Sequence, residues 1–460
     1  MKRKRPNTQG SDRPIPGTKA TGFWLMLKWL LFRFLETASN TRSRLRSAPA
    51  SGRTNAPPAF GPGRESIWIY VSTIGELNAI EPFLRPFIAE MAPTPVTLLT
   101  DRTIYRQSYC AKYPDAHVYE MDGTVRDVDR LFVATPPRLL LIAEIPCLLS
   151  DAPCRLPFAA IHAAKRHGAA VAIINGWTYG YAPSSRLDAI EHRLFSRDYL
   201  SLMDLITVQN EDVRQNLIAA GANPASVHVT GNSKFDAVVR QDFSPRGKRS
   251  EAILRSIIDG GRPCVVAGCV TDDAGQALVL DAFGIVSEKI PNALLVLAPR
   301  HPENMKMIAK LEASLRKRAL RHLFRSRIAN IPLASDIQVL ILDTIGELRD
   351  FYATSTVCYV GVNHNILEPL VFCKPVTVSP GWEATFPSYP VYELLRGTEG
   401  VHEFSSCEAH AQSWLQVLSE SETEGARSTA IERVLTRLRG ASKANSQLLR
   451  QITRGRNWHL

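Results

Sequence analysis

The chain alternates, from residue 66 onward, between short and almost wholly apolar runs and segments of helix length. Runs such as 138–144 (RLLLIAE) and 293–298 (ALLVLA) are apolar at nearly every position, which is typical of strands buried on both faces of a parallel sheet. The expected strands are 66–72, 95–100, 138–144, 170–175, 205–209, 227–231, 263–268, 293–298, 338–342, 357–361 and 375–379. The alternation predicts an α/β fold whose parallel sheets are covered by helices on both faces.

A polar break at 242–250, which contains Pro245 and Gly247, divides the series of strands into two. Each part has enough strands and helices for a sheet of its own, so we predict two Rossmann-like domains, 64–241 and 242–424. A basic segment, 1–63, precedes them. A helical stretch with a basic tail, 425–460, follows them and is expected to pack back on the first domain.

The positive charge of the chain lies at its ends. The whole chain carries +11, but residues 1–60 have twelve Lys and Arg against two acidic residues, and residues 425–460 have eight against one. The body between them is therefore mildly acidic. This distribution argues against a groove for nucleic acid and favours termini that lie on an anionic membrane surface.

The most apolar stretch is 23–35 (FWLMLKWLLFRFL). It is too short to span a bilayer, which takes about 20 apolar residues, and Lys28 and Arg33 interrupt it. We predict an amphipathic helix at the membrane interface, with Trp24 and Trp29 at headgroup depth and both cations reaching lipid phosphates. Two alternatives stay open: a helix docked on the protein's own core, and a cleaved signal peptide, which the internal charges disfavour. Residues 40–63 are expected to form a flexible linker.

Eight cysteines are scattered along the chain without a C-x-x-C pair, and most lie in apolar runs. They are expected to be free thiols in a reducing cytoplasm. No zinc-ligand pattern occurs in the sequence, and no Asp-x-Asp follows a strand, so we expect no metal and no other cofactor.

Polar residues gather immediately after several of the expected strands. In open parallel sheets, ligands bind beyond the carboxyl ends of the strands, so these positions are expected to border a crevice. The segments are Thr73–Glu76 in the first half and Ala298–His301, Asp343–Glu347, Val362–Glu368 and Ser379–Trp382 in the second.

The residue types fit glycosyl transfer. The reaction needs a base for the acceptor hydroxyl and cations or helix N-termini for the charge that grows on a leaving phosphate. Glu76 suits the first task and Arg300, which is always charged, suits the second. Helices beginning near Gly346 and Asn365 offer free N–H groups to the same phosphate, and Glu368 is placed to accept from ribose hydroxyls.

Each of these residues also has a purely structural alternative. Glu76 could cap the helix expected at 77–90, Arg300 could pair with Glu303, and His364 could be a core histidine. Their recurrence at one edge of two sheets favours a site.

These segments, in this order, resemble the 3-deoxy-D-manno-octulosonic acid (Kdo) transferase family over residues 66–395. Two of the segments stand nearly letter for letter in the family pattern: Ala-Pro-Arg-His-Pro-Glu and Asp-Thr-Ile-Gly-Glu-Leu. The matching segments are Thr73–Glu76, Val229–Asp236, Ala298–Glu303, Asp343–Leu348 and His364–Pro369.

The resemblance implies a GT-B fold, an acceptor domain at 64–241 and a nucleotide-sugar donor domain at 242–424. It implies metal-independent, inverting transfer of Kdo from its cytidylate (CMP-Kdo) to a lipid A precursor, by a protein anchored at the cytoplasmic face of a bacterial inner membrane. Glu76 would be the base and Arg300 the phosphate ligand. The other residues implied in donor binding are His301, Thr344, Gly346, Glu347, His364, Asn365 and Glu368; Glu144 and Asn175 would orient the acceptor or the sugar.

Departures from the family pattern lie mainly in the first half. Tyr70 replaces a usual His, Asp101 begins a segment that replaces a Thr- and Gly-rich turn, and Trp177 stands where an Arg normally follows Asn175. The acceptor side is therefore expected to differ more than the nucleotide side. The alternatives are a GT-B transferase with another donor or acceptor, a nucleotide-sugar epimerase, and a catalytically silent membrane-bound relative.

Overall fold

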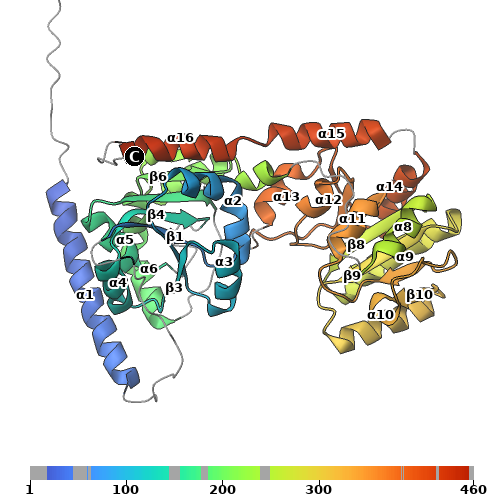
Figure 1. Cartoon of the computed structure of the whole chain (residues 1–460), viewed down its shortest axis with the longest axis horizontal. Coiled ribbons are helices and arrows are strands. Elements are labelled where there is room, and N and C mark those ends of the chain that lie inside the picture. The colour runs from blue at the N-terminus through green and yellow to red at the C-terminus, as the bar shows by residue number, and fades with distance from the viewer. Residues whose placement is uncertain are drawn as a thin grey trace, which may run out of the picture.

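Two parallel seven-stranded sheets form two domains that are joined side by side (Figure 1). The computed structural model describes residues 18–44, 60, 64–144, 156–177, 185–238, 249–384, 386, 388–420 and 424–454. Both sheets are covered by helices on both faces, as the continuous apolar runs predict. The predicted division between residues 241 and 242 lies outside the described residues.

The first sheet has the strand order β3-β2-β1-β4-β5-β6-β7, which is doubly wound about β1 and β4. Its strands are β1 (Ser66–Tyr70), β2 (Val96–Thr100), β3 (His117–Glu120), β4 (Pro137–Ala143), β5 (Ala170–Gly176), β6 (Leu205–Val208) and β7 (Val227–Val229). Its helices are α2 (Ile74–Glu90), α3 (Arg106–Lys112), α4 (Val125–Ala134), α5 (Phe158–Arg166), α6 (Arg186–Ser201) and α7 (Glu211–Ala219).

The second sheet has the order β10-β11-β9-β8-β12-β13-β14. Its strands are β8 (Cys264–Val270), β9 (Leu294–Pro299), β10 (His322–Phe324), β11 (Val339–Ile341), β12 (Val357–Val360), β13 (Val376–Val378) and β14 (Val401–Glu403). Its helices are α8 (Glu251–Asp259), α9 (Asp273–Lys289), α10 (Met305–Lys317), α11 (Leu348–Thr354), α12 (Leu367–Leu370), α13 (Tyr389–Leu395) and α14 (Cys407–Ser419). Every predicted strand is present, and β3, β10 and β14 are additional.

The N-terminal helix α1 (Thr18–Arg44) lies along the side of the first domain that faces away from the second (Figure 1). Its inner face is part of the core, because Trp29 and Phe32 are buried among residues of α5 and α6. Lys28 forms an ion pair with Asp198 of α6. Two expectations are therefore wrong: Trp29 and Lys28 face the protein and do not face lipid headgroups.

The outer face of α1 is apolar and exposed. The side chains that form it are Phe23, Trp24, Met26, Leu27, Leu30, Leu31 and Phe34. The helix thus docks on the protein and still presents an apolar surface. It also extends to Arg44, so the first part of the segment expected as a linker is helical. In the described part of the chain, no helix is long and apolar enough to cross a membrane.

Two C-terminal helices, α15 (Glu424–Arg437) and α16 (Ala441–Arg454), lead from the second domain back to the first (Figure 1). The Asp236 carboxylate accepts hydrogen bonds from the N–H groups of Gly440 and Ser442, at 2.5 and 2.6 Å, and so anchors the start of α16. Leu449 of α16 is fully buried in the core that also holds α2. The C-terminal stretch therefore packs on the first domain, as expected from the sequence.

Candidate functional site

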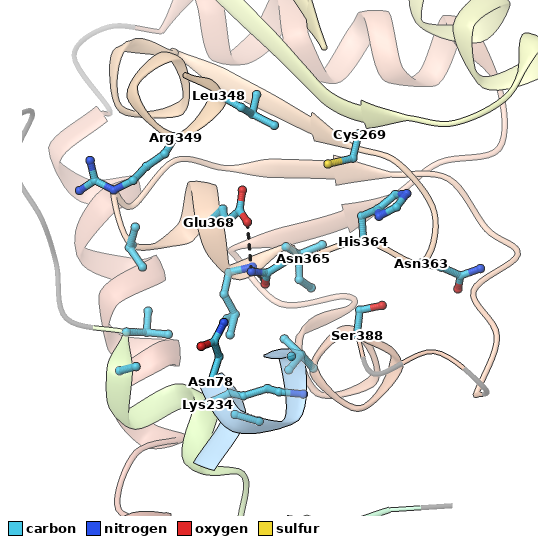
Figure 2. Close-up of a pocket in the computed structure, with 18 of the residues that line it drawn as sticks. Asn78, Lys234, Cys269, Leu348, Arg349, Asn363, His364, Asn365, Glu368 and Ser388 are labelled. Carbon is cyan, nitrogen blue, oxygen red and sulfur yellow. Dashed lines mark hydrogen bonds between the residues drawn. The ribbon is translucent and has the colours of Figure 1, made fainter. Parts of the chain in front are cut away.

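A cavity of about 880 Å³ opens between the two domains (Figure 2). Its volume lies within the range of about 300 to 1,000 Å³ usual for small-molecule sites. One wall comes from the start of α2 and from the segment that follows β7, and the other from loops at the carboxyl ends of β8, β9, β11 and β12. Its polar and charged lining residues are Asn78, Lys234, Cys269, Arg300, Arg349, Asn363, His364, Asn365, Glu368 and Ser388.

Arg300 follows β9 and is exposed in this cavity. Its backbone N–H donates to Val270 O at 3.0 Å, which fixes the turn after the strand. Among the described residues, its guanidinium has no ion-pair partner, since Glu303 pairs with His301 at 3.0 Å instead. The structural alternative for Arg300 is therefore not realised, and its charge faces the cavity. His301, also expected to bind the donor, is not among the lining residues.

His364, Asn365 and Glu368 face the cavity from the loop after β12 and the start of α12 (Figure 2). The His364 ring lies 2.9 Å from Thr271 Oγ1. Burial, and next the charge of Arg300, lower the pKa of His364 to about 4, so the ring is neutral at physiological pH. It can donate or accept a hydrogen bond there, but it brings no positive charge.

Asn365 and Glu368 are held to one another. Asn365 Nδ2 donates to Glu368 Oε1 at 3.4 Å, and Asn365 Oδ1 accepts from Leu367 N at 3.1 Å, at the start of α12. Burial raises the pKa of the Glu368 carboxyl. Lys374, the lysine nearest to Glu368 in the sequence, pairs with Glu424 and does not neutralise Glu368. Glu368 is thus available to accept from a bound ligand.

The turn between β11 and α11 contributes Gly346 to the lining, with φ of +93°. Thr344 and Glu347 lie behind this turn and are not among the lining residues. The Thr344 hydroxyl donates to the Glu347 carboxylate, which also forms a buried ion pair with Arg325 at 3.2 Å. The structure therefore places these two residues where they support the turn, although both were expected to contact the donor.

Glu76 lies at the third position of α2 and completes a capping box with Thr73. Its Oε2 accepts from Ser72 N at 2.7 Å and from Thr73 N at 3.3 Å. Glu76 therefore caps the start of α2, as its structural alternative proposed, and it does so through Oε2. The side chain is only 1% exposed, and burial, with Glu144 as the next cause, raises its pKa to about 8. Gly75 beside it lines the cavity, but Glu76 itself does not.

Glu144 and Asn175 end β4 and β5 with positive φ angles of 60° and 56°. Such left-handed backbone is strained for residues other than glycine and is enriched at functional sites. Glu144 forms an ion pair with Lys234 at 3.0 Å. Asn175 donates through Nδ2 to Ser233 Oγ at 2.8 Å. Both predicted residues therefore contact the segment that joins the domains, and neither lines the cavity.

Lys234 lines the cavity, although it is not among the site residues predicted from the sequence; it lies in the matching segment Val229–Asp236. It stands on the opposite side of the cavity from Glu368 and Asn365 (Figure 2). Cys269, with φ of 57°, was also missed, because nothing in an apolar strand marks its last residues as strained. Within the described ranges, no three His, Cys, Asp or Glu side chains cluster as metal ligands would.

Two parallel-sheet domains with an interdomain cavity define the GT-B architecture, and solved structures share it. HepE from Anabaena, in complex with UDP, superposes with a TM-score of 0.55 at 11% identity, covering 85% of this chain and 99% of its own. A putative UDP-N-acetylglucosamine 2-epimerase from Listeria monocytogenes superposes with a TM-score of 0.52 at 13% identity, covering 86% and 98%. These likenesses show the fold alone.

Similarity in sequence points to one family of enzymes. Residues 39–237 match the family model described as 3-deoxy-D-manno-octulosonic-acid transferase (kdotransferase). The 3-deoxy-D-manno-octulosonic acid transferase of Haemophilus influenzae is 25% identical over 448 residues, which cover 94% of this chain and 97% of the relative. That of Bordetella pertussis is 26% identical, covering 73% and 78%. The chain is therefore similar to Kdo transferases, by the family model over residues 39–237 and by a relative over 94% of its length.

Proposed function

We propose that this protein transfers Kdo from CMP-Kdo to a lipid A precursor at the cytoplasmic face of a bacterial inner membrane. The observation that carries the proposal is the arrangement of charge about the cavity. Arg300 faces it from the second domain without an ion-pair partner in the described chain, and Lys234 lines it from the first domain. Behind this lining lie Glu144, which pairs with Lys234, and Glu76, which follows the lining residue Gly75. Sequence similarity to Kdo transferases supports Kdo as the sugar.

On the donor side, the guanidinium of Arg300 would hold the phosphate of the donor and stabilise the charge that develops on the leaving cytidylate. Asn365 and Glu368 would position the nucleotide, Glu368 by accepting from ribose hydroxyls. His364, being neutral, would contribute a hydrogen bond. Gly346 has no side chain, so its turn leaves room for the donor. The hydrogen bond between Thr344 and Glu347 stabilises the turn on the side away from the cavity.

On the acceptor side, Glu76 would take the proton of the attacking hydroxyl through Oε1, since Oε2 is engaged by backbone N–H groups. A base must first be ionised, and the raised pKa of Glu76 means that ionisation takes place near pH 8. The hydroxyl oxygen would then attack the anomeric carbon on the face opposite the cytidylate, which inverts the configuration. In this proposal the reaction uses no metal and no cofactor.

The membrane part of the proposal is supported by α1. Its outer face presents a continuous apolar surface that includes Trp24, Leu27, Leu31 and Phe34. An exposed apolar helix face of this size suits the boundary between headgroups and acyl chains. A helix that lies in the membrane plane and is packed on the acceptor domain would bring a lipid acceptor to that domain.

The experiment is an assay of CMP release from CMP-Kdo with a lipid A precursor in mixed micelles. We expect release by the wild type and loss of release in Glu76→Ala and Arg300→Ala. The control is Glu288→Ala, an exposed residue of α9 that does not line the cavity, and it should have wild-type activity. Release with other nucleotide sugars only would replace the proposal by a transferase of different donor. No release with any donor would identify a silent relative.

The alternative with a structural argument in its favour is a transferase that uses CMP-Kdo with a different acceptor. Tyr70, which replaces a usual histidine, donates through its hydroxyl to Asp101 Oδ1 at 3.2 Å. Two of the departures from the family pattern therefore form one contact beyond the first-domain sheet. If CMP-Kdo is consumed only with glycolipids other than the lipid A precursor, the donor part of the proposal stands and the acceptor part falls.

A further inference from the structure

Two side chains of the first domain, Gln209 and Trp177, donate hydrogen bonds to one short region of the second domain. We call this pair of contacts the clamp. Gln209, directly after β6, donates through Nε2 to Pro390 O in the first turn of α13, at 2.7 Å. Trp177, directly after β5, donates through Nε1 to Ala384 O at 3.3 Å. The Trp177 ring also lies 6.2 Å, between centroids, from that of Tyr389. Both first-domain side chains are buried; the Gln209 bond is buried with them, and the Trp177 bond is partly buried.

The clamp continues into the first domain as a chain of buried amides. Gln209 Oε1 accepts from Asn232 Nδ2 at 3.0 Å, so both ends of the Gln209 amide are engaged. Asn232 Oδ1 in turn accepts from the backbone N–H of Lys234 at 3.0 Å. Asn232 therefore links the Gln209 side chain to the backbone of Lys234, which lines the cavity.

The same chain reaches the helix that carries Glu76. Ser233, between Asn232 and Lys234, donates through Oγ to Ala79 O in α2, at 2.7 Å. Ala79 lies one helical turn after Glu76 and lines the cavity. The position of the proposed base and the position of Lys234 are thus tied to the clamp.

On the second domain, the clamped region is equally close to the donor wall. Ser388 and Val391, on either side of Tyr389 and Pro390, line the cavity. The backbone N–H of Glu383, next to Ala384, donates to Asn363 Oδ1 at 2.8 Å, and Asn363 lines the cavity as well. The clamp therefore connects the first-domain wall of the cavity to its second-domain wall.

We propose that Gln209 and Trp177 are positioning residues that hold the donor wall and the base-bearing wall at the separation glycosyl transfer requires. The inference rests on the proposed function. Donor and base sit on different domains, so the rate of transfer depends on the relative placement of the domains, and a misplacement of about 1 Å can cost about 100-fold in rate. Nucleotide binding uses residues of the second domain and does not need the clamp.

The test is Gln209→Met, which keeps the length and apolar bulk of the side chain and removes both hydrogen bonds. The matched control is Gln215→Met on the exposed face of α7, where Gln215 bonds only to Glu211 among the contacts described. Because both buried hydrogen bonds of the Gln209 amide are lost, we expect kcat to fall about tenfold or more. The Kd for CMP, measured by calorimetry, should stay within about twofold of the wild type. Small-angle scattering of the full chain should show a larger radius of gyration, because the domains part.

Trp177→Phe is the second variant, because it keeps an aromatic ring and removes only the N–H donor. We expect it to fold and to show a smaller fall in kcat than Gln209→Met, again with CMP affinity unchanged. Either variant with wild-type kcat and wild-type scattering overturns the proposal. So does a loss of CMP affinity equal to the loss of kcat, because it would mean that the donor site itself is distorted. If the wild type transfers no sugar, the proposed function fails, while scattering and CMP binding still decide whether the clamp sets the domain separation.

Discussion

Glu76 performs a structural task and is proposed to perform a chemical one. Its backbone contacts with Ser72 and Thr73 fix the first turn of α2. The same burial that makes these contacts strong removes its carboxylate from water, and the nearby charge of Glu144 adds to the effect, so its pKa rises to about 8. A carboxylate with a pKa of about 8 is a stronger base than an ordinary glutamate, but only part of it is ionised at neutral pH.

The first prediction is therefore a pH profile. Since Glu76 must be ionised, kcat/KM for CMP release should increase with pH and level off above about 8. Glu144→Gln should move the midpoint to lower pH, because it removes a neighbouring negative charge and leaves Lys234 without its ion-pair partner. Initial rates at low donor concentration, from about pH 6 to about pH 10, check both expectations. A midpoint that stays in place in Glu144→Gln would contradict the coupling of the two carboxylates.

The second prediction concerns Arg325, which supports the Gly346 turn from behind. It is buried, pairs with Glu347, and donates through Nε to Ser250 Oγ at 2.9 Å. Arg325→Met leaves the Glu347 charge buried without its cation, which should cost about 3 to 5 kcal/mol of stability. CMP should also bind more weakly, because the turn is loosened. Thermal unfolding and CMP calorimetry check this prediction.

Two variants control for a general effect of losing an arginine there. Arg327→Met removes an exposed cation two residues away and should change stability by less than about 1 kcal/mol. Adding Glu347→Gln to Arg325→Met should recover part of the loss, because the buried charge is gone. If Arg327→Met is as damaging as Arg325→Met, the buried ion pair is not the cause.

At the scale of the element, α1 shows what an apolar run can and cannot predict. The run 23–35 identified a helix of limited length, but its apolar residues occur on more than one side, so the sequence could not show which face meets the protein. That choice depends on partners distant in sequence: Asp198 attracts Lys28, and Phe195 packs against Trp29 and Phe32. Trp24 and Trp29 look alike in the sequence and have opposite environments in the fold.

The third prediction uses this pair of tryptophans. Trp29→Ala removes a buried ring and should destabilise the first domain by about 3 to 5 kcal/mol. Trp24→Ala, on the outer face, should leave the melting temperature unchanged and should reduce sedimentation with vesicles that contain anionic lipid. Equal vesicle binding by wild type and Trp24→Ala would argue against the outer face of α1 as the membrane contact.

The strands missed from the sequence are also explained at this scale. β3, β10 and β14 are short and lie at sheet edges. Each carries a histidine, and β3 and β14 also carry a glutamate. Edge strands are often short and polar. Central strands have neighbours on both sides and helices on both faces, so they must be apolar, and the sequence predicts them well.

For the whole molecule, the sequence predicted two domains and a site at the carboxyl ends of their strands. It did not separate the residues that line the cavity from those that support its walls. Glu347 and Arg300 both follow strands, yet Arg325, from another part of the chain, occupies the Glu347 carboxylate. Nor could it predict the clamp, because Gln209 and Pro390 are 181 residues apart and the acceptor is a backbone carbonyl.

The last prediction concerns the return of the chain to the first domain through α16. Leu449 is fully buried against the core beneath α2, although it belongs to the last helix of the chain. Leu449→Ala should cost about 2 to 5 kcal/mol and loosen α2. Faster hydrogen exchange is then expected in α2, with β8 and β9 of the second domain unaffected. Gln451→Ala, exposed on the same helix, is the control and should leave exchange unchanged.

This experiment decides whether α16 is a structural part of the first domain. If exchange in α2 rises and CMP release falls while CMP affinity is retained, the C-terminal helix supports the base-bearing wall, as Leu449 and the Asp236 anchor indicate. If the hydrogen-exchange rate of α2 in Leu449→Ala equals that of the wild type, the first domain is stable without the packing of α16. In that case, the orientation of the two domains depends on contacts such as those of Gln209 and Trp177 and does not need α16.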